Sequence, residues 1–432
     1  MTDDLMYRFL RPWVEYATRC HYASITIRGR ERLPDTGSYI IAPCHQNALM
    51  EPLLILLLTP RPVYHICRGD IFENPKIARI LTFLKIFPIF RRRDGMASLQ
   101  RNEETFDKSR KVLVDGFPLS MMAEGQHTDR HQLLPLVKGM FRIAGSAQQQ
   151  MGDKPLFIVP LGIDLDDYER PYSHAVLQVG EPIDVRPYMN LFTTDEPQAL
   201  NEMRYELTLR LNAVMHNIDS RDHYLQFEAL CNLLNPQERR HLNLRNTPFN
   251  RFLCRQQIAH RLDTLEQRAR TAAHLHTPTE NLVAQELEKQ LHLADQTIAW
   301  CKQHHRRLKT IAEPMPLTYR LGRIALLLAV AAACISVPIL RHVLLFLLLA
   351  YPLPFIPTHL IVRRLIDDTQ FRSSINFGVR LALFVVYTLV FALVIGIIKG
   401  PLWALLSIAT AVVAARIAPK VFDWCRRTVG LG

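Results

Sequence analysis

Apolar positions from about residue 25 to 185 form short runs that alternate with amphipathic stretches. This alternation predicts an α/β domain in which a central sheet is flanked by helices, and we assign it to residues 23–190. The clearest strands are 38–42, 86–90, 119–122, 156–162 and 175–180, and the clearest helices are 74–84 and 98–114.

Residues 181–321 contain no glycine and are rich in residues that tolerate helix. Apolar side chains recur at helical spacing in 200–218 and 285–309, with Pro-containing punctuation between these stretches. The pattern predicts a helical region over residues 191–320, which reads as an insertion or hairpin and not as a second catalytic unit.

The first 22 residues predict an amphipathic helix, because Leu5, Phe9 and Trp13 recur at helical spacing between basic residues. Such a helix suits a membrane interface, and it equally suits packing on a catalytic core. Pro12 is expected to kink or split it.

The last hundred residues predict a membrane region over 321–432 with about four transmembrane helices. The apolar segments are 324–340, 342–362, 381–398 and 401–418. Basic residues before the first segment, in the middle loop and at the end favour both termini and the catalytic domain in the cytoplasm. The chain is thus expected to be a multi-pass protein of the inner (cytoplasmic) membrane. Two re-entrant hairpins are the alternative, because four prolines interrupt the first two segments.

The net charge of +12 suits either nucleic acid or an anionic membrane as a partner. No nucleic-acid-binding motif accompanies the charge, so we expect anionic lipid and phosphorylated substrates and no nucleic acid. The eight cysteines are scattered without a Cys-x-x-Cys pair, which is typical of reduced cytoplasmic thiols. No signal peptide is expected, since Asp3 and Asp4 begin the chain without a following apolar core.

Candidate chemistry begins with His45, which follows the 38–42 strand and precedes Glu51 by six positions. The carboxylate can accept one imidazole N–H and leave the other ring nitrogen to take a proton. Cys44 offers an alternative nucleophile, but adjacent residues of an extended chain point to opposite faces.

Three later blocks also place polar residues after apolar runs. Arg91 and Arg93 follow 86–90, and Glu124 and Gly125 follow 119–122, with Lys138 shortly afterwards. The third block is the run 156–162, which contains Pro160 and ends in Gly162. Sites in α/β folds are built where strands hand over to loops, so we expect these residues to gather near His45.

Taken together, these blocks resemble the four motifs of the glycerolipid acyltransferases, over roughly residues 25–185. The matching elements are the His45-to-Glu51 segment, Pro88 to Arg91, Glu124-Gly125 and Ile158 to Pro160. The resemblance implies acyl transfer from acyl-CoA or acyl carrier protein to a phosphate-bearing glycerol, with no cofactor and no metal.

The chain departs from the family pattern in each of the first three motifs. The acid, Glu51, stands one residue later than the usual His-x4-Asp spacing places it, as in some glycerol-3-phosphate acyltransferases. Lys85 replaces a glycine in the second motif, and Ala123 and Gln126 replace a proline and a threonine in the third. The last change bears on the acceptor site more than on the chemistry.

The resemblance assigns roles residue by residue. His45 is the general base and Glu51 orients it, without a covalent intermediate. Arg91 binds the acceptor phosphate, with Arg93 as a second possibility, because a guanidinium matches phosphate oxygens. Glu124 contacts acceptor hydroxyls or holds the arginine, and Gly125 lets a ligand approach the backbone. Lys138 adds a second phosphate contact. Pro160 shapes the pocket wall.

His127 and His131 have a zinc-like i, i+4 spacing, but the intervening residues favour a loop, so no metal site is predicted. No Walker motif and no Gly-x-Ser-x-Gly elbow is present. The leading prediction is a membrane-bound 1-acylglycerol-3-phosphate acyltransferase of phospholipid biosynthesis. The alternatives are a glycerol-3-phosphate acyltransferase and a catalytically lapsed lipid-binding scaffold. A transporter is disfavoured, because the last two segments carry no ionisable residue mid-span.

Overall fold

The computed structural model describes residues 5–45, 49–90, 96–126, 128, 130–167, 172–272, 278–305, 308, 317–336, 358, 361–362, 364 and 369–429. Two units make up the fold. The first comprises Met1–Tyr16, Thr26–Asp164 and Val176–Asn217, and the second comprises Ala17–Ile25, Leu165–Ala175 and Ile218–Gly432.

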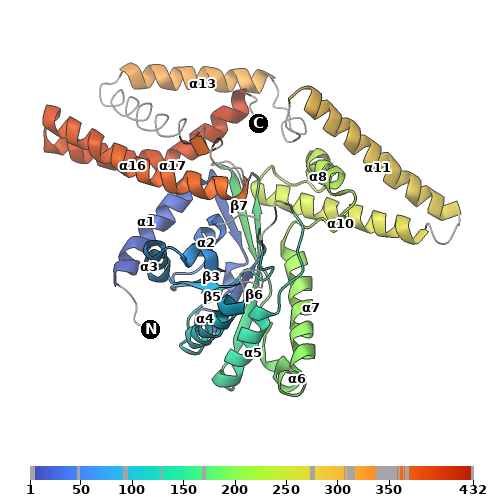
Figure 1. Ribbon diagram of the computed structural model, residues 1–432. Helices are drawn as coiled ribbons and strands as arrows, with labels where there is room; N and C mark the ends of the chain where they lie inside the picture. The colour runs from blue at the N-terminus through green and yellow to red at the C-terminus, as the bar shows by residue number, and fades with distance from the viewer. Residues whose placement is uncertain are drawn as a thin grey trace. The chain divides into compact units, whose positions relative to one another are not determined.

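Within the described ranges, eight strands form one sheet in the order β1-β7-β6-β2-β5-β3-β4, with β8 paired to β6 (Figure 1). Their bounds are β1 Ser24–Arg28, β2 Ser38–Pro43, β3 Tyr64–Arg68, β4 Ile86–Ile89, β5 Leu119–Ser120, β6 Leu156–Leu165, β7 His174–Val179 and β8 Ile183–Asp184. All five predicted strands are confirmed, with shifts of one to three residues at their ends.

The centre of the sheet is parallel: β2 pairs with β5 and β6, and β3 pairs with β4 and β5. Every residue of β2 is buried, as expected for a strand covered on both faces. Because parallel strands end at the same edge, β2 and its neighbour β5 end side by side, and β4 ends at the same edge beyond β3. This edge receives His45 from β2 and Glu124 from β5.

Helices flank the sheet, which confirms the predicted α/β class (Figure 1). Asn74 caps α3 by accepting hydrogen bonds from the backbone N–H groups of Lys76 and Ile77, and Asp195 caps α7 in the same way. The helices of this unit are α2 Met50–Ile55, α3 Pro75–Phe83, α4 Met96–Val114, α5 Gly139–Met151, α6 Met189–Thr194 and α7 Glu196–Val214. Short 3-10 turns are Arg30–Arg32, Gly69–Phe72 and Arg186–Tyr188.

Helix α1, Leu5–His21, runs through Pro12 without a break, contrary to the expected split. Its residues in the first unit are anchored by Arg11, whose guanidinium donates to the backbone carbonyls of Leu56, Thr59, Pro60 and Arg61. The opposite face exposes a row of large apolar side chains, Leu5, Met6, Phe9 and Trp13. The helix therefore packs on the α/β unit and still presents an apolar face to its surroundings.

Lys85 shows how the chain tolerates the loss of a glycine from the second motif. Its backbone has a φ of 61°, in the left-handed region that favours glycine. Its ammonium lies 4.9 Å from the ring centroid of Tyr7 and 5.2 Å from that of Tyr64. These two cation–π contacts offset part of the conformational cost.

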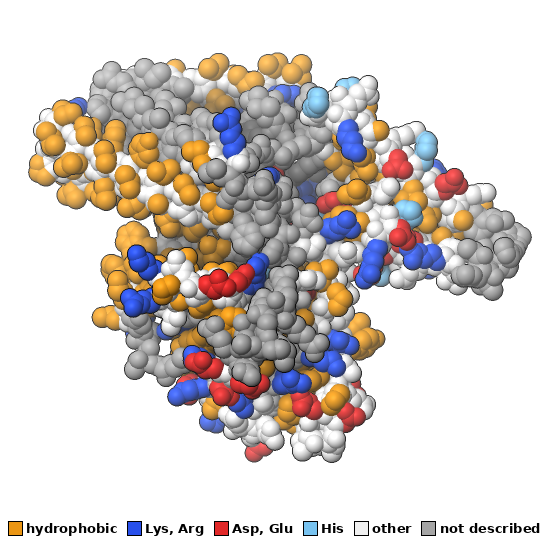
Figure 2. Space-filling view, viewed as in Figure 1, with side chains coloured by type: hydrophobic (Ala, Val, Ile, Leu, Met, Phe, Trp, Pro, Cys, Tyr) orange, Lys and Arg blue, Asp and Glu red, His pale blue; other side chains and the backbone are white. Residues whose placement is uncertain are grey.

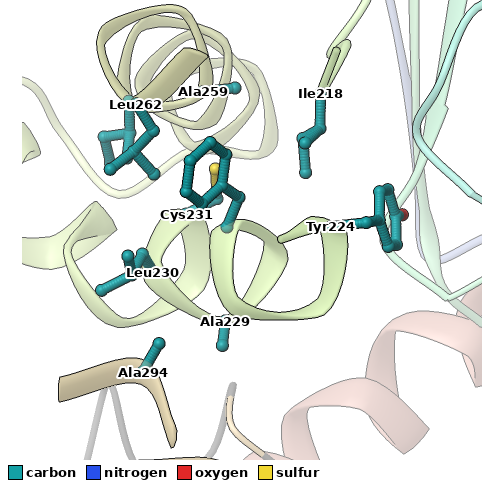
Figure 3. Close-up of a cluster of buried hydrophobic side chains, with 10 residues drawn as sticks. Ile218, Tyr224, Ala229, Leu230, Cys231, Ala259, Leu262 and Ala294 are labelled. Atoms are coloured by element: carbon teal, nitrogen blue, oxygen red, sulfur yellow. The ribbon is translucent and has the colours of Figure 1, made fainter. Parts of the chain in front are cut away.

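The helical region of the second unit comprises α8 Tyr224–Leu233, α9 Asn235–His241, α10 Pro248–Ala272 and α11 Pro278–Gln303. Their apolar faces share one core (Figure 3), since Phe227 and Leu230 of α8 meet Ala259 and Leu262 of α10, and Ala294 comes from α11. The predicted helical character of this region is confirmed.

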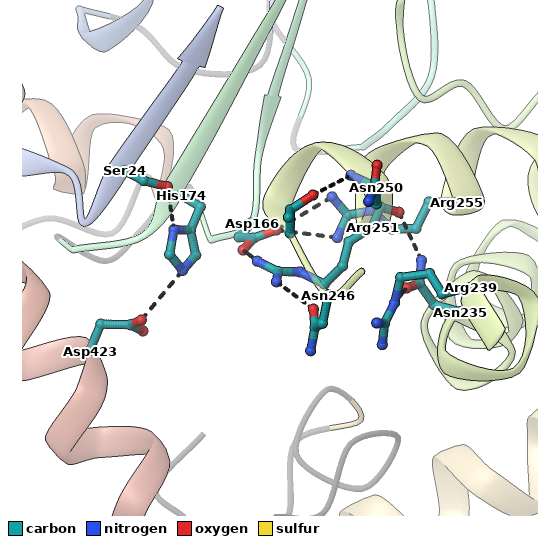
Figure 4. A network of polar contacts seen from close by, with 11 residues as sticks. Ser24, Asp166, His174, Asn235, Arg239, Asn246, Asn250, Arg251, Arg255 and Asp423 are labelled. Atoms are coloured by element: carbon teal, nitrogen blue, oxygen red, sulfur yellow. Dashed lines mark hydrogen bonds and ion pairs between the residues drawn. The ribbon is translucent and has the colours of Figure 1, made fainter. Parts of the chain in front are cut away.

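A buried ionic cluster ties α10 to the end of β6 (Figure 4). Asp166 Oδ2 lies 2.9 Å from Arg251 Nη2, and its Oδ1 lies 3.4 Å from Arg255 Nη1. Nearby, His174 bridges Ser24 Oγ, at 2.7 Å from Nδ1, and Asp423 Oδ2, at 3.4 Å from Nε2. Both clusters are sets of ion pairs and hydrogen bonds that connect segments within the second unit.

The C-terminal helices are α13 Leu317–Ser336, α16 Thr369–Lys399 and α17 Pro401–Val429. Gly400, with a φ of 96°, joins α16 to α17 as a hairpin in which Ala411 packs against Phe384 and Phe391. The hairpin exposes many large apolar side chains, among them Leu389, Leu393, Ile397 and Leu405 (Figure 2).

In the described part of the chain, two helices are long and apolar enough to cross a bilayer: Arg372–Lys399 and Pro401–Cys425. Only 11% and 17% of their most apolar windows are buried. These helices contain the third and fourth predicted segments. Helix α13 covers much of the first segment, and the second lies almost entirely outside the described residues.

Candidate active site

The two residues of the predicted base-plus-orienter pair meet directly. His45 Nδ1 lies 2.6 Å from Glu51 Oε2. Glu51 sits in the first turn of α2 and has no exposed surface, whereas 14% of the His45 side chain is exposed. The longer spacing is thus accommodated by the start of the helix, which turns the carboxylate back toward the end of β2.

This contact fixes how the imidazole can act. A carboxylate accepts hydrogen bonds, so His45 Nδ1 carries the hydrogen that it donates to Glu51. The remaining ring nitrogen, Nε2, is then the atom that would accept a proton. A carboxylate in this position would also stabilise the imidazolium that such a transfer produces.

Glu124 holds the backbone of the base. Its Oε1 accepts the N–H of His45 at 2.9 Å, and its Oε2 accepts the N–H of Leu134 at 3.0 Å. The carbonyl of His45 accepts the N–H of Thr128 at 3.3 Å. Burial raises the pKa of Glu124 to about 7, against the two backbone hydrogen bonds, which favour the charged form. The geometry gives this side chain a positioning contact that the sequence did not predict, because its partners are main-chain groups.

Cys44 is placed as a packing residue. Its Sγ lies 3.2 Å from the N–H of Ile163 and 3.5 Å from the carbonyl of Ile163, on the neighbouring strand β6. Burial, followed by the charge of Glu51, raises the pKa of the thiol well above its usual value. A buried thiol with a raised pKa is a poor nucleophile, which disfavours Cys44 as the reactive group.

Gly125 and Lys138 come from two segments that lie against each other. Gly125 has a φ of 66°, and a Cβ on it would stand 3.1 Å from Cγ1 of Val137. Val137 also donates its N–H to the carbonyl of Ala123 at 2.7 Å. Lys138, the next residue, is exposed at the start of α5. The structure thus brings the third motif and Lys138 to one place.

Arg91 and Arg93 lie outside the described residues. The strand that leads to them is held by a clamp that sequence reasoning missed. Asn102 accepts the N–H of Phe90 at 2.8 Å and donates to its carbonyl at 2.9 Å, and Thr105 donates to the carbonyl of Pro88 at 2.7 Å. The only hint of this clamp in the sequence was the presence of polar residues at the positions of α4 that face β4.

His127 also lies outside the described residues, so the predicted i, i+4 pair has no described geometry. His131 lies instead beside Asp164 and His216. Pro160 occupies the middle of β6, opposite Ala42 of β2.

A family model described as Acyltransferase matches residues 24–164. These residues form an acyltransferase domain. The match covers every candidate residue from His45 to Lys138, so the family predicted from the four motifs is confirmed.

Two known proteins resemble part of the chain. The 1-acyl-sn-glycerol-3-phosphate acyltransferase of Bacillus subtilis (strain 168) is 23% identical over 203 residues, which are 45% of this chain and 90% of that protein. The crystal structure of the 1-acyl-sn-glycerophosphate (LPA) acyltransferase PlsC from Thermotoga maritima is 18% identical, with a TM-score of 0.35. That alignment covers 49% of this chain and 82% of that one.

Proposed function

We propose that this protein is a 1-acylglycerol-3-phosphate acyltransferase, which moves a fatty acyl group from acyl-CoA or acyl carrier protein to lysophosphatidate. The observation that carries the proposal is the 2.6 Å contact between His45 and the buried Glu51, inside the acyltransferase domain. The similarity to the 1-acyl-sn-glycerol-3-phosphate acyltransferase of Bacillus subtilis supports the choice of acceptor.

The reaction needs one proton to move twice. His45 Nε2 takes the proton of the acceptor hydroxyl while the hydroxyl oxygen attacks the thioester carbonyl carbon. The tetrahedral intermediate then collapses, the carbon–sulfur bond breaks, and the departing thiolate recovers the proton from His45. No bond to the protein forms, which agrees with the buried and packed position of Cys44.

We propose that cationic side chains hold the acceptor. In the proposal Arg91 binds the phosphate, with Arg93 and the exposed Lys138 as further contacts. Glu124 keeps the main chain of His45 in place, so that the base meets the hydroxyl of a phosphate-anchored substrate in a fixed geometry.

We propose that the enzyme lies in the cytoplasmic membrane, among anionic lipids, with its catalytic domain facing the cytoplasm. The exposed apolar hairpin of α16 and α17 supports anchoring, and the row of Leu5, Met6, Phe9 and Trp13 supports contact with the interface. Both lysophosphatidate and the product are lipids, so an enzyme on the membrane meets its substrate without extracting it.

The first test is acyl transfer by the purified full chain in detergent, with radiolabelled acyl-CoA and, in parallel, acyl carrier protein. Lysophosphatidate and glycerol-3-phosphate are offered separately, because the six-residue spacing of His45 and Glu51 resembles some enzymes that use the latter. Product from lysophosphatidate alone is expected. Product from glycerol-3-phosphate alone would replace the proposed acceptor.

Two variants separate catalysis from folding. His45→Ala should abolish transfer, whereas His260→Ala, on the exposed surface of α10, should leave it unchanged. Full activity of the His45→Ala protein would refute the proposed base. Lipid binding by a folded wild-type protein without turnover for any donor would favour the lapsed scaffold.

The membrane orientation is tested with alkaline phosphatase, which is active only after export. Fusion after Gly400, between α16 and α17, should be active, and fusion after Gly432 should be inactive. Equal activity at both positions would contradict two spans that meet at Gly400.

A further inference from the structure

Three metal-ligating side chains converge at the carboxyl edge of the sheet, beside the dyad but separate from it. They are His131, from the loop after β5, Asp164, near the end of β6, and His216, two residues beyond α7. One ligand atom from each lies within 4.8 Å of the others. Two imidazoles and a carboxylate are a donor set typical of Zn²⁺ and related divalent transition metals.

A glycine explains why His216 reaches Asp164. A Cβ on Gly162 would stand 1.8 Å from the carbonyl oxygen of Val214, so only glycine lets the end of α7 approach β6 this closely. From this crossing, two residues along each segment lead to Asp164 and His216. Packing of two backbones has therefore brought a carboxylate and an imidazole together.

A second contact sets the loop that carries His131. The N–H of Leu133 donates to Asn217 Oδ1 at 2.7 Å, which ties the loop to the residue after His216. The rings of His131 and His216 lie with centroids 4.5 Å apart and planes tilted by 34°. The three segments are thus fixed independently of any ion.

The separations fit ligands of one ion better than a hydrogen bond. His131 Nδ1 lies 3.8 Å from Asp164 Oδ1. A charge-assisted hydrogen bond measures about 2.7–2.9 Å, so this pair is too far apart for one. Two ligands at about 2.0–2.2 Å from a tetrahedral zinc stand roughly 3.3–3.6 Å apart. Small side-chain rotations would bring all three atoms to that separation.

Burial makes the set suited to a cation. Asp164 and His216 are each 2% exposed, whereas 16% of the His131 side chain is exposed. A divalent ion would neutralise the buried carboxylate in a low-dielectric setting, where charge pairing is strongest. Three protein ligands leave a fourth position, which solvent can reach from the side of His131.

We propose that His131, Asp164 and His216 bind one Zn²⁺ ion. The ion joins β6, the loop after β5 and the end of α7. Leu134, three residues beyond His131, donates its N–H to Glu124, which in turn holds the N–H of His45. The metal therefore acts as a positioning element behind the base and has no part in the proton transfers. This assignment stands whether or not the protein transfers acyl groups.

The test uses the full chain, purified in detergent without a histidine tag, stripped with a chelator and dialysed. Titration with Zn²⁺ alone should end at one ion per chain. Replacement by Co²⁺ should give the strong visible d–d absorption of a tetrahedral site with nitrogen and oxygen ligands. Weak, non-saturating uptake of Zn²⁺ together with the spectrum of hydrated Co²⁺ would overturn the proposal.

Variants identify the ligands. Asp164→Asn and His216→Ala should each lower Zn²⁺ affinity at least 10- to 100-fold, the range that loss of an outer partner alone can cause. His260→Ala, at an exposed position of α10, should bind like the wild type. Far-UV circular dichroism of each metal-free variant checks folding. Unchanged affinity in both folded ligand variants would refute the site. If His216→Ala fails to fold, the isosteric Asp164→Asn decides the outcome.

Discussion

Replacing Glu51 by glutamine isolates the charge that supports the imidazolium. Glutamine has nearly the same shape, and its amide oxygen can still accept the Nδ1 hydrogen of His45. The variant therefore retains the orientation of the ring and loses the negative charge 2.6 Å from it. Since Glu51 is fully buried in α2, the change should not touch a bound substrate.

The expected magnitude follows from that contact. A hydrogen bond to a charged group contributes about 1.5–3 kcal/mol, and the charge on the ring develops only as the proton moves. At about 1.36 kcal/mol per tenfold change in rate, kcat should fall about 10- to 150-fold. KM for the acceptor should stay near its wild-type value, because ground-state binding is not altered.

The assay is steady-state acyl transfer with both substrates varied, accompanied by thermal unfolding of each protein. The matched control is Glu206→Gln, which removes a partly exposed carboxylate paired with Arg210 on α7. Glu51→Asp gives a second reading, because its shorter side chain withdraws the carboxylate from Nδ1. Unchanged kcat in a stable Glu51→Gln protein would refute the assigned role, and a rise in KM alone would show that Glu51 acts on binding.

Further outcomes follow from burial and charge. Burial raises the pKa of Glu124 from 4.5 to about 7. The folded protein therefore binds this proton more tightly than the unfolded chain does. The resulting stabilisation is fully present below about pH 4.5 and is lost as the pH rises through about 7. Denaturant unfolding across this range should show a pH-dependent loss of about 3 kcal/mol that Glu124→Gln lacks, and identical slopes would contradict it. Arg11→Ala should lower the free energy of unfolding by at least about 2 kcal/mol, because four backbone carbonyls lose the guanidinium that donates to them. The control Arg79→Ala, at an exposed position, should leave the free energy of unfolding unchanged. Asp166→Asn should lower the free energy of unfolding by about 3–5 kcal/mol, because it leaves the buried charge of Arg251 uncompensated. In hydrogen exchange, the amides of α10 should then lose their protection earlier than in the wild type. Unchanged protection of α10 would argue against this role for the cluster.

The amino-acid sequence was enough to predict the α/β class and the positions of the five main strands. These follow from runs of apolar residues, which report burial locally and need no knowledge of the rest of the chain. It also determined the contact between His45 and Glu51, because six residues across a strand end and a helix start leave few ways to separate them. The place of Glu124 after β5 was predictable because it closely follows the apolar run 119–122.

How these parts meet depends on the tertiary fold. The bond from the His45 N–H to Glu124 spans 79 positions, and the cluster of His131, Asp164 and His216 depends on a backbone crossing at Gly162. Hydropathy periodicity carries no information about the order of strands in a sheet, and that order selects which distant loops become neighbours. The same holds for Arg11, whose partners are backbone carbonyls about 50 residues away, since a carbonyl looks alike at every position of a sequence.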